Sequence, residues 1–269
     1  MTARQFLASV HTNLVFYRRN RLLVLAGLVV LLALVISIIS SGFTASDHFD
    51  LIQGLVSMIE GFTFVFTAIL GLVAVSHHVR TRSVKLVLTR PFSLGGWVLS
   101  HFASAVLVVL VLHLVILIVA VILFFAWDLP FQWGLLVDIA SSVLTCLTVF
   151  VFMQLLSTLV HPAVGAVIAV IFNPSSVHAM LTMIEAPRRF ASSDIGAVFY
   201  QVLSWLLTGL YYLLPEYMPF GRDLQTVFAT YRVTRFDLPY IVLTVLYTTL
   251  TVSLYLMLTT VVLRRKRLI

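Results

Sequence analysis

Residues 97–126 read WVLSHFASAVLVVLVLHLVILIVAVILFFA. These 30 residues contain no Asp, Glu, Lys or Arg. An α-helix needs about 20 predominantly apolar residues to cross the hydrocarbon core of a bilayer, so this stretch can span a membrane and still tilt or protrude from it. It predicts a transmembrane helix.

The composition of the whole chain agrees with that prediction. Of 269 residues, 61% are hydrophobic and 10% are charged, and the mean hydropathy is +1.10. A soluble domain with this balance would have too few polar side chains to cover its core. The single cysteine, Cys146, lies within an apolar stretch, which excludes a disulfide framework and a cysteine-based metal site. We therefore expect an all-α, polytopic membrane protein.

Five further apolar stretches bring the prediction to six transmembrane helices. The predicted spans cover residues 22–41, 54–75, 97–126, 135–160, 163–184 and 239–263. The fourth span ends at the turn His161-Pro162, and Asn173-Pro174 interrupts the fifth. Residues 22–269 are expected to form a single transmembrane domain.

The basic residues predict the orientation of these spans. Three segments hold 12 of the 17 Lys and Arg residues and no acidic residue: Arg4, Arg18, Arg19 and Arg21; Arg80, Arg82, Lys85 and Arg90; and Arg264, Arg265, Lys266 and Arg267. Lys and Arg mark cytoplasmic loops, and three such segments on one side require an even number of spans. We expect both termini in the cytoplasm, in a prokaryotic cytoplasmic (inner) membrane. The net charge of +7 therefore reflects topology and does not indicate a nucleic-acid partner.

One apolar stretch does not fit this count as a span. Residues 195–214 lie in the predicted outer region, 185–238, and a seventh span here would place the C-terminal basic cluster outside. Its aromatic residues suit the headgroup level of the bilayer, so a re-entrant or interfacial helix is expected. A spanning helix is the alternative.

Two segments are expected on the cytoplasmic surface. Residues 1–21 have apolar side chains at three- and four-residue intervals, which predicts an amphipathic helix that anchors to lipid, docks a partner, or does both. The loop of residues 76–96 contains no Gly or Pro from residue 77 to 89, and Arg90-Pro91 ends that run. It predicts a short helix that projects into the cytoplasm.

These features together resemble a known family. Residues 87–93 read VLTRPFS and follow the short predicted helix, residues 18–21 read RRNR and lead into the first span, residues 211–215 read YYLLP, and residues 264–268 read RRKRL. In this order they are similar to the ABC-2-type transporter permeases, the membrane-spanning subunits of ABC exporters. The resemblance covers essentially the whole chain in layout.

The resemblance implies that one subunit spans the membrane and that another subunit hydrolyses ATP. The chain has no G-x-x-x-x-G-K-[ST] phosphate loop, so ATP and Mg²⁺ would be bound by a cytoplasmic ABC ATPase present in two copies, and this chain is not expected to be an enzyme. A second copy of the chain, or a homologous permease, would complete the path. The resemblance makes residues 77–90 the coupling helix. The residues implied in coupling are His77, His78, Arg80, Arg82, Val84, Lys85, Leu86, Leu88 and Arg90.

Polar residues within the spans are candidates for a pathway or for helix packing. They are Glu60, His113, Asp138 and Thr145. A carboxylate in the membrane is expensive unless it is paired or hydrated, so Glu60 has either a structural hydrogen bond or a role in substrate or proton movement. No catalytic, metal-binding or cofactor-binding residues are expected. Two other functions remain open. The complex could act mechanically on an extracytoplasmic partner protein without moving a substrate, or Glu60 and His113 could serve an intramembrane enzyme.

Overall fold

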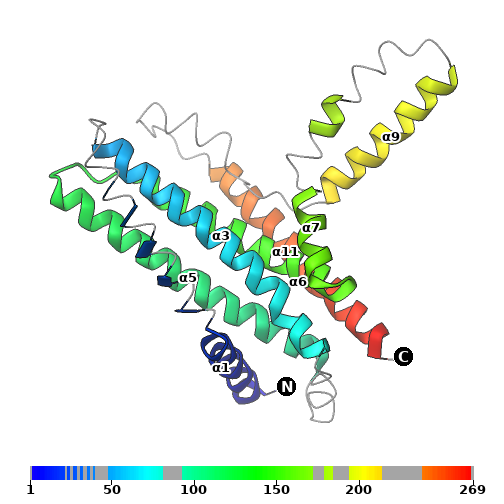
Figure 1. Cartoon of the computed structure of the whole chain (residues 1–269), viewed down its shortest axis with the longest axis horizontal. Helices are drawn as coiled ribbons and strands as arrows, with labels where there is room; N and C mark the ends of the chain where they lie inside the picture. The colour runs from blue at the N-terminus through cyan, green and yellow to red at the C-terminus, as the bar shows by residue number, and fades with distance from the viewer. Residues whose placement is uncertain are drawn as a thin grey trace.

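The computed structural model of the chain describes residues 2–21, 23–24, 27–28, 31–32, 35–36, 39, 48–80, 93–171, 179–183, 194–213 and 238–267. Seven helices are defined within these residues (Figure 1): α1 (Ala3–Arg19), α3 (His48–Arg80), α5 (Leu94–Ala126), α6 (Gly134–Leu159), α7 (Pro162–Ile171), α9 (Asp194–Leu213) and α11 (Leu238–Arg267). The described part of the chain contains no β-strand. The expectation of an all-helical fold is confirmed for these residues.

Four helices are long and apolar enough to cross a membrane. They contain the segments Leu51–His78, Leu94–Ala126, Gly134–Leu159 and Val245–Lys266. These segments coincide with the second, third, fourth and sixth predicted spans, and they identify the chain as a helical membrane protein. Since α3 and α5 each have 33 residues, each is about 50 Å long and exceeds the roughly 30 Å hydrocarbon core.

The other two predicted spans are described only in part. The described residues between 23 and 39 are helical, and the rest of the span 22–41 lies outside the described residues. The fifth span begins as α7, and residues 179–183 are also helical, whereas the predicted break at Asn173-Pro174 lies outside the described residues. The total of six spans stays a prediction.

Local sequence explains where the long helices begin and end. Ser93 caps α5, because its hydroxyl accepts a hydrogen bond from the backbone N–H of Gly96 at 3.2 Å. Helix α6 ends at Leu159 because the next residue, Val160, is extended, and Pro162 starts α7, where its missing N–H group is not needed. The predicted turn at His161-Pro162 is therefore found, and the imidazole of His161 accepts a hydrogen bond from the backbone of Ala163.

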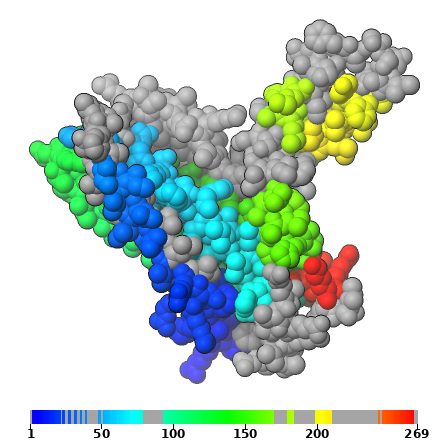
Figure 2. All heavy atoms as spheres, viewed as in Figure 1, coloured from blue at the N-terminus to red at the C-terminus, as the bar shows by residue number. Residues whose placement is uncertain are grey.

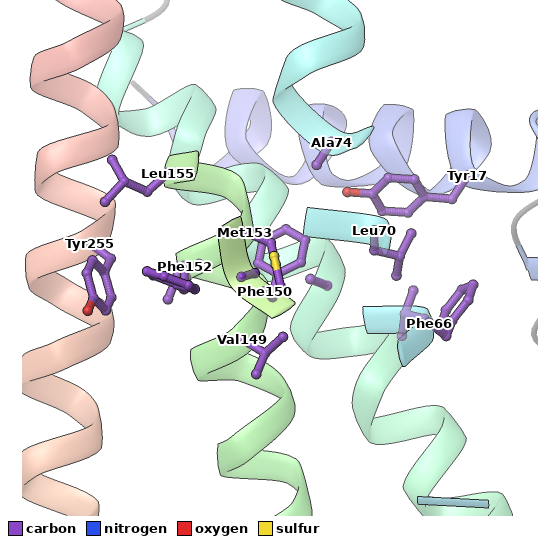
Figure 3. Close-up of a cluster of buried hydrophobic side chains, with 14 residues drawn as sticks. Tyr17, Phe66, Leu70, Ala74, Val149, Phe150, Phe152, Met153, Leu155 and Tyr255 are labelled. Atoms are coloured by element: carbon purple, nitrogen blue, oxygen red, sulfur yellow. The ribbon is translucent and has the colours of Figure 1, made fainter. Parts of the chain in front are cut away.

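Helices α3 and α6 form the closest contact in the core. A Cβ atom added to Gly71 of α3 would lie 2.5 Å from the carbonyl oxygen of Phe150 and 2.8 Å from Cβ of Met153. Small residues allow helix backbones to approach in this way inside membranes. Figure 3 shows the apolar cluster around this contact, in which Phe150 and Met153 of α6 face Leu70 and Ala74 of α3.

Four helix ends meet at one end of the bundle, which we call the basal end. It comprises the last turns of α3, α6 and α11 and the first turns of α5, with α1 packed beside them (Figure 1). Val75, Trp97 and Leu263 form one buried apolar cluster there, which fixes the ends of α3, α5 and α11 against each other. Figure 2 shows α1 lying against the lower part of α3.

Helix α9 lies apart from the four long helices in both views (Figures 1 and 2). One of its faces is apolar and exposed, formed by Val198, Phe199, Val202, Trp205 and Leu206. The spacing of these residues places them along one side of a helix. A helix therefore occupies most of the predicted segment 195–214, and its re-entrant or interfacial position stays a prediction.

Candidate functional site

The basal end is the first candidate site, and α1 is held there by polar contacts with α5. The hydroxyls of Ser9 and Ser100 are 2.8 Å apart, and Nδ2 of Asn13 donates to Oγ of Ser100 at 3.2 Å. The hydroxyl of Ser104 donates to the backbone carbonyl of Val10 at 3.3 Å. The predicted amphipathic helix is thus docked on the bundle through a mixed face, in which Val10, Asn13 and Tyr17 are buried, and Leu7 remains exposed.

These polar contacts were not predicted from the sequence. Ser9 and Asn13 are four residues apart, as are Ser100 and Ser104, so each pair lies on one side of its helix. Two such pairs of small polar residues are the signal that could have indicated the contact. Their partners are more than 80 residues apart in the chain, and no local pattern connects them.

The two histidines of the predicted coupling helix lie in the last turns of α3. The sequence indicated a separate short helix from His77, whereas α3 continues without a break to Arg80. The ring of Phe16 in α1 is 5.1 Å from that of His77 and 5.2 Å from that of His78. His78 also packs on α5, with ring centroids 5.5 Å from His101 and 5.7 Å from Trp97. The tertiary contacts with α1 and α5 account for the longer helix.

The remaining residues predicted for coupling cannot be placed in the same way. Arg80 is the last residue of α3. The others lie outside the described residues: Arg82, Val84, Lys85, Leu86, Leu88 and Arg90. The segment that carries them starts at the end of α3 and returns to α5 at Ser93, so it is attached to two of the helices that meet at the basal end.

Three fully buried polar side chains lie on helices that converge at the basal end. Neither ring nitrogen of His101, neither amide atom of Gln154, nor the hydroxyl of Tyr17 has a hydrogen-bond partner among the described residues. Burial raises the pKa of Tyr17 above its usual range. In Figure 3 the Tyr17 side chain points past Ala74 toward α6 at Phe150 and Met153. Unpaired buried polar groups are destabilising, so this joint is weaker than an apolar one.

The C-terminal end of α11 is tied to α6 at the basal end. The ammonium group of Lys266 donates to the carbonyl of Thr158 and, at 3.4 Å, to that of Leu159. These carbonyls belong to the last turn of α6, which has no helical partners for them. A positive charge at a helix C-terminus is also favoured by the helix dipole. One residue of the predicted basic tail therefore has a structural role.

The second candidate site lies between α3, α5 and α6, within the membrane-spanning segments. Nδ1 of His113 is 2.8 Å from the carbonyl oxygen of Val109, and its Nε2 is 3.0 Å from Oγ of Ser142. Oε1 of Glu60 in α3 is buried without a hydrogen-bond partner among the described residues. Cys146, one turn further along α6 than Ser142, is buried. Ser142, which the sequence did not single out, is the residue of α6 that contacts His113 of α5.

The other two intramembrane candidates take no direct part in this contact. Thr145 is buried and donates to the backbone carbonyl of Ser141 in its own helix, as expected for a packing residue. Asp138 is exposed near the start of α6, one turn before Ser142. The described residues contain no group of three or more His, Cys, Asp or Glu side chains that could hold a metal ion.

The Ser142–His113 pair has the distance of a nucleophile and its base, but its surroundings do not fit acyl transfer. Ser142 lies within α6, where the backbone N–H groups are engaged in helical hydrogen bonds. Acyl transfer needs donors that are free to stabilise an oxyanion. The geometry at Ser142 therefore argues against the hydrolytic version of the enzyme hypothesis.

Neither a scan against protein-family models nor a search of curated proteins finds a match for this chain.

Proposed function

We propose that this chain is the membrane-spanning permease subunit of an ATP-driven exporter in a prokaryotic cytoplasmic membrane. ATP hydrolysis takes place in two copies of a separate cytoplasmic ATPase, and a second permease chain completes the path. The resemblance to ABC-2-type permeases is one support for this proposal. The other is the arrangement of the basal end.

One observation carries the proposal: the segment predicted to couple to the ATPase leaves from the joint of α1, α3 and α5. Phe16 contacts His78, and His78 contacts Trp97 and His101, so the three helices share one set of contacts. A force applied to residues 81–92 acts on α3 and α5 directly and on α1 through these rings. A partner that moves this segment can therefore move three helices together.

The charges of the basal end are consistent with this partner. Arg80 ends α3, and Arg264 and Arg265 are exposed at the end of α11. Because both basic segments lie at the same end of the bundle, the positive-inside rule assigns that end to the cytoplasm. Both termini are then cytoplasmic, and α1 lies at the inner membrane surface.

The proposal predicts an ATPase encoded next to this chain, and the test is whether that ATPase co-purifies with charge-reversed variants. Arg80→Glu combined with Arg82→Glu should abolish the complex. Arg264→Glu combined with Arg265→Glu, which makes the same charge change at the same end, should leave most of it. An ATPase that still co-purifies with the first variant would contradict the coupling assignment. Equal loss in both variants would indicate a nonspecific electrostatic attraction instead.

A second candidate function is mechanical. In it, the complex uses ATP to pull on an extracytoplasmic protein and moves no substrate. The exposed apolar face of α9, which lies apart from the long helices, favours this alternative because it could bind such a protein. ATPase activity stimulated by substrate in lipid would support export, whereas activity that requires an added extracytoplasmic protein would support the mechanical function.

A further inference from the structure

His101 lies among the contacts that join α1, α3 and α5 at the basal end. Its ring centroid is 4.7 Å from that of Trp97 in its own helix and 5.5 Å from that of His78 in α3. Ser100, the residue before it, and Ser104, on the next turn of α5, hold α1 through hydrogen bonds. A change at His101 therefore acts on the contacts of α5 with both α1 and α3.

The surroundings of His101 accommodate a neutral imidazole but not a charged one. An imidazolium has two N–H groups, and each of them requires an acceptor. The His101 side chain is fully buried, and neither ring nitrogen has a hydrogen-bond partner among the described residues. A buried cation without hydrogen bonds or a counter-charge is far more unfavourable than a buried neutral ring.

The described helices also supply no carboxylate near the basal end that could compensate such a charge. Helices α1, α5 and α11 contain no Asp or Glu, and neither does the sequence of residues 81–92. Glu60 of α3 lies about five turns before His78, or about 27 Å along the helix, and Asp138 is near the opposite end of α6. The titratable and charged groups of the elements that meet here are neutral or basic: Arg4, His11, Tyr17, Arg18 and Arg19 of α1, His77, His78 and Arg80 of α3, and Arg264, Arg265, Lys266 and Arg267 of α11.

We propose that His101 makes the basal joint an acid-sensitive latch. The latch is closed while His101 is neutral. When the imidazole binds a proton, the joint opens, water supplies the acceptors that the imidazolium needs, and α1 separates from α5. Histidine side chains change charge between about pH 5 and 8. Because the open joint binds one proton more than the closed joint, the closed form is lost as the pH falls.

The latch determines which helices follow a movement of residues 81–92. In the closed form α1 moves with α3 and α5, because the rings of Phe16 and His78 are in contact and the serines of α5 hold α1. In the open form the same movement reaches α3 and α5 only. This regulatory role rests on the proposed function, since it needs an ATPase that moves the segment. The latch itself is a property of this chain alone.

The experiment measures how α1 is covered in the full chain in lipid nanodiscs, without an ATPase. Cys146→Ala removes the natural thiol, and Val10→Cys then places one beneath the joint, where Val10 is 6% exposed. Leu7→Cys, at a position of the same helix that is 65% exposed, is the matched control, because it corrects for the pH dependence of the thiol reaction itself. The rate of labelling by a water-soluble maleimide is measured for both. The ratio of the Val10→Cys rate to the Leu7→Cys rate should rise from about pH 7.5 to about pH 5.5, by up to about tenfold per pH unit, the limit for one bound proton.

Two substitutions assign the response to His101. The rise should disappear in His101→Phe, which keeps a ring against Trp97 and His78 but binds no proton. It should persist in His77→Phe, which removes an exposed imidazole of the same ring cluster. If His101→Phe does not fold, His101→Gln replaces it, because an amide also binds no proton in this pH range.

Three results would overturn the latch. A ratio that stays constant with pH would mean that the joint does not open in acid. A rise that persists in the His101 variant, or one that His77→Phe abolishes, would mean that another group binds the proton. Because no ATPase is present, these results leave the proposed function standing, and failure of the ATPase to co-purify leaves the latch standing.

Discussion

The contact between Gly71 and α6 leads to a sharp prediction about stability. An alanine at this position would place its Cβ 2.5 Å from the carbonyl oxygen of Phe150 and 2.8 Å from Cβ of Met153. Ordinary contacts begin at 3.4 Å. Both obstructing atoms are part of the backbone or attached to it, so no change of side-chain rotamer removes the overlap. The two helices must therefore separate by roughly 1 Å, which breaks the packing on both sides of the contact.

The expected loss follows from two opposing effects. Overpacking in a tight core costs about 1–3 kcal/mol. Replacing glycine by alanine within a helix recovers about 0.5–1 kcal/mol of intrinsic stability. Gly71→Ala should therefore lower the stability by up to about 2.5 kcal/mol in net terms. Gly61→Ala is the matched control, because Gly61 lies in the same helix and an added Cβ meets nothing within 4 Å. It should be neutral or stabilising.

The chain carries a natural reporter for this measurement. Cys146 is the only cysteine, and it is buried in α6. A dye that becomes fluorescent on reaction with thiols will label it only when the bundle opens, so a thermal ramp in detergent gives an unfolding temperature for each variant. We expect Gly71→Ala to unfold at a lower temperature than wild type, and Gly61→Ala to unfold at or above the wild-type temperature. If Gly71→Ala melts at or above the temperature of Gly61→Ala, the close approach of α3 and α6 is wrong.

Two further predictions concern the basal end. Burial raises the pKa of Tyr17, so the folded state holds the phenol proton more tightly than the unfolded state does. The resulting stabilisation is complete below pH about 10 and is lost as the pH rises further. Tyr17→Phe should therefore lose less stability at alkaline pH in thermal melts followed by circular dichroism. Lys266→Met should lower the stability by about 1 kcal/mol, because it leaves the carbonyl groups at the end of α6 without a cation. Arg265→Met removes the same charge one residue away and should lower the unfolding temperature less in the thiol-reactivity melt. Equal effects of the two variants would exclude a specific role for Lys266.

The long helices were predictable from the sequence because membrane spans depend on local composition. The predicted span 97–126 ends at the same residue as α5, and the span 135–160 differs from α6 by one residue at each end. Apolar length and the turn at His161-Pro162 are sufficient for this, since every backbone polar group in a bilayer must be paired within the helix. No knowledge of distant neighbours is needed.

The joint at the basal end was not predictable in the same way. His77 and His78 are polar residues after an apolar run, and on composition alone they belong to a loop. Their place in α3 depends on Phe16, more than 60 residues earlier, and on Trp97 and His101 beyond the loop. Ser142 was missed for a similar reason. A serine in an apolar helix is usually a packing residue, and only the approach of α5 gives it the imidazole of His113 as a polar partner.

The order of the contacts along α3 connects the two candidate sites. Glu60, Gly71 and His78 follow one another in this helix, at the intramembrane site, at the tight contact with α6 and at the basal joint. Because Gly71 packs backbone against backbone, a displacement of α3 at His78 is passed to α6 rather than absorbed by side chains. Helix α6 carries Ser142, so Glu60 and Ser142 move together as parts of one pair of helices. Helix α5 meets this pair through side chains, namely the buried cluster of Ile116 and Phe124 with Ile59 of α3, the aromatic rings at the basal end and the His113–Ser142 hydrogen bond. A movement that starts at residues 81–92 would therefore change the His113–Ser142 distance before it changes the distance between Glu60 and Ser142.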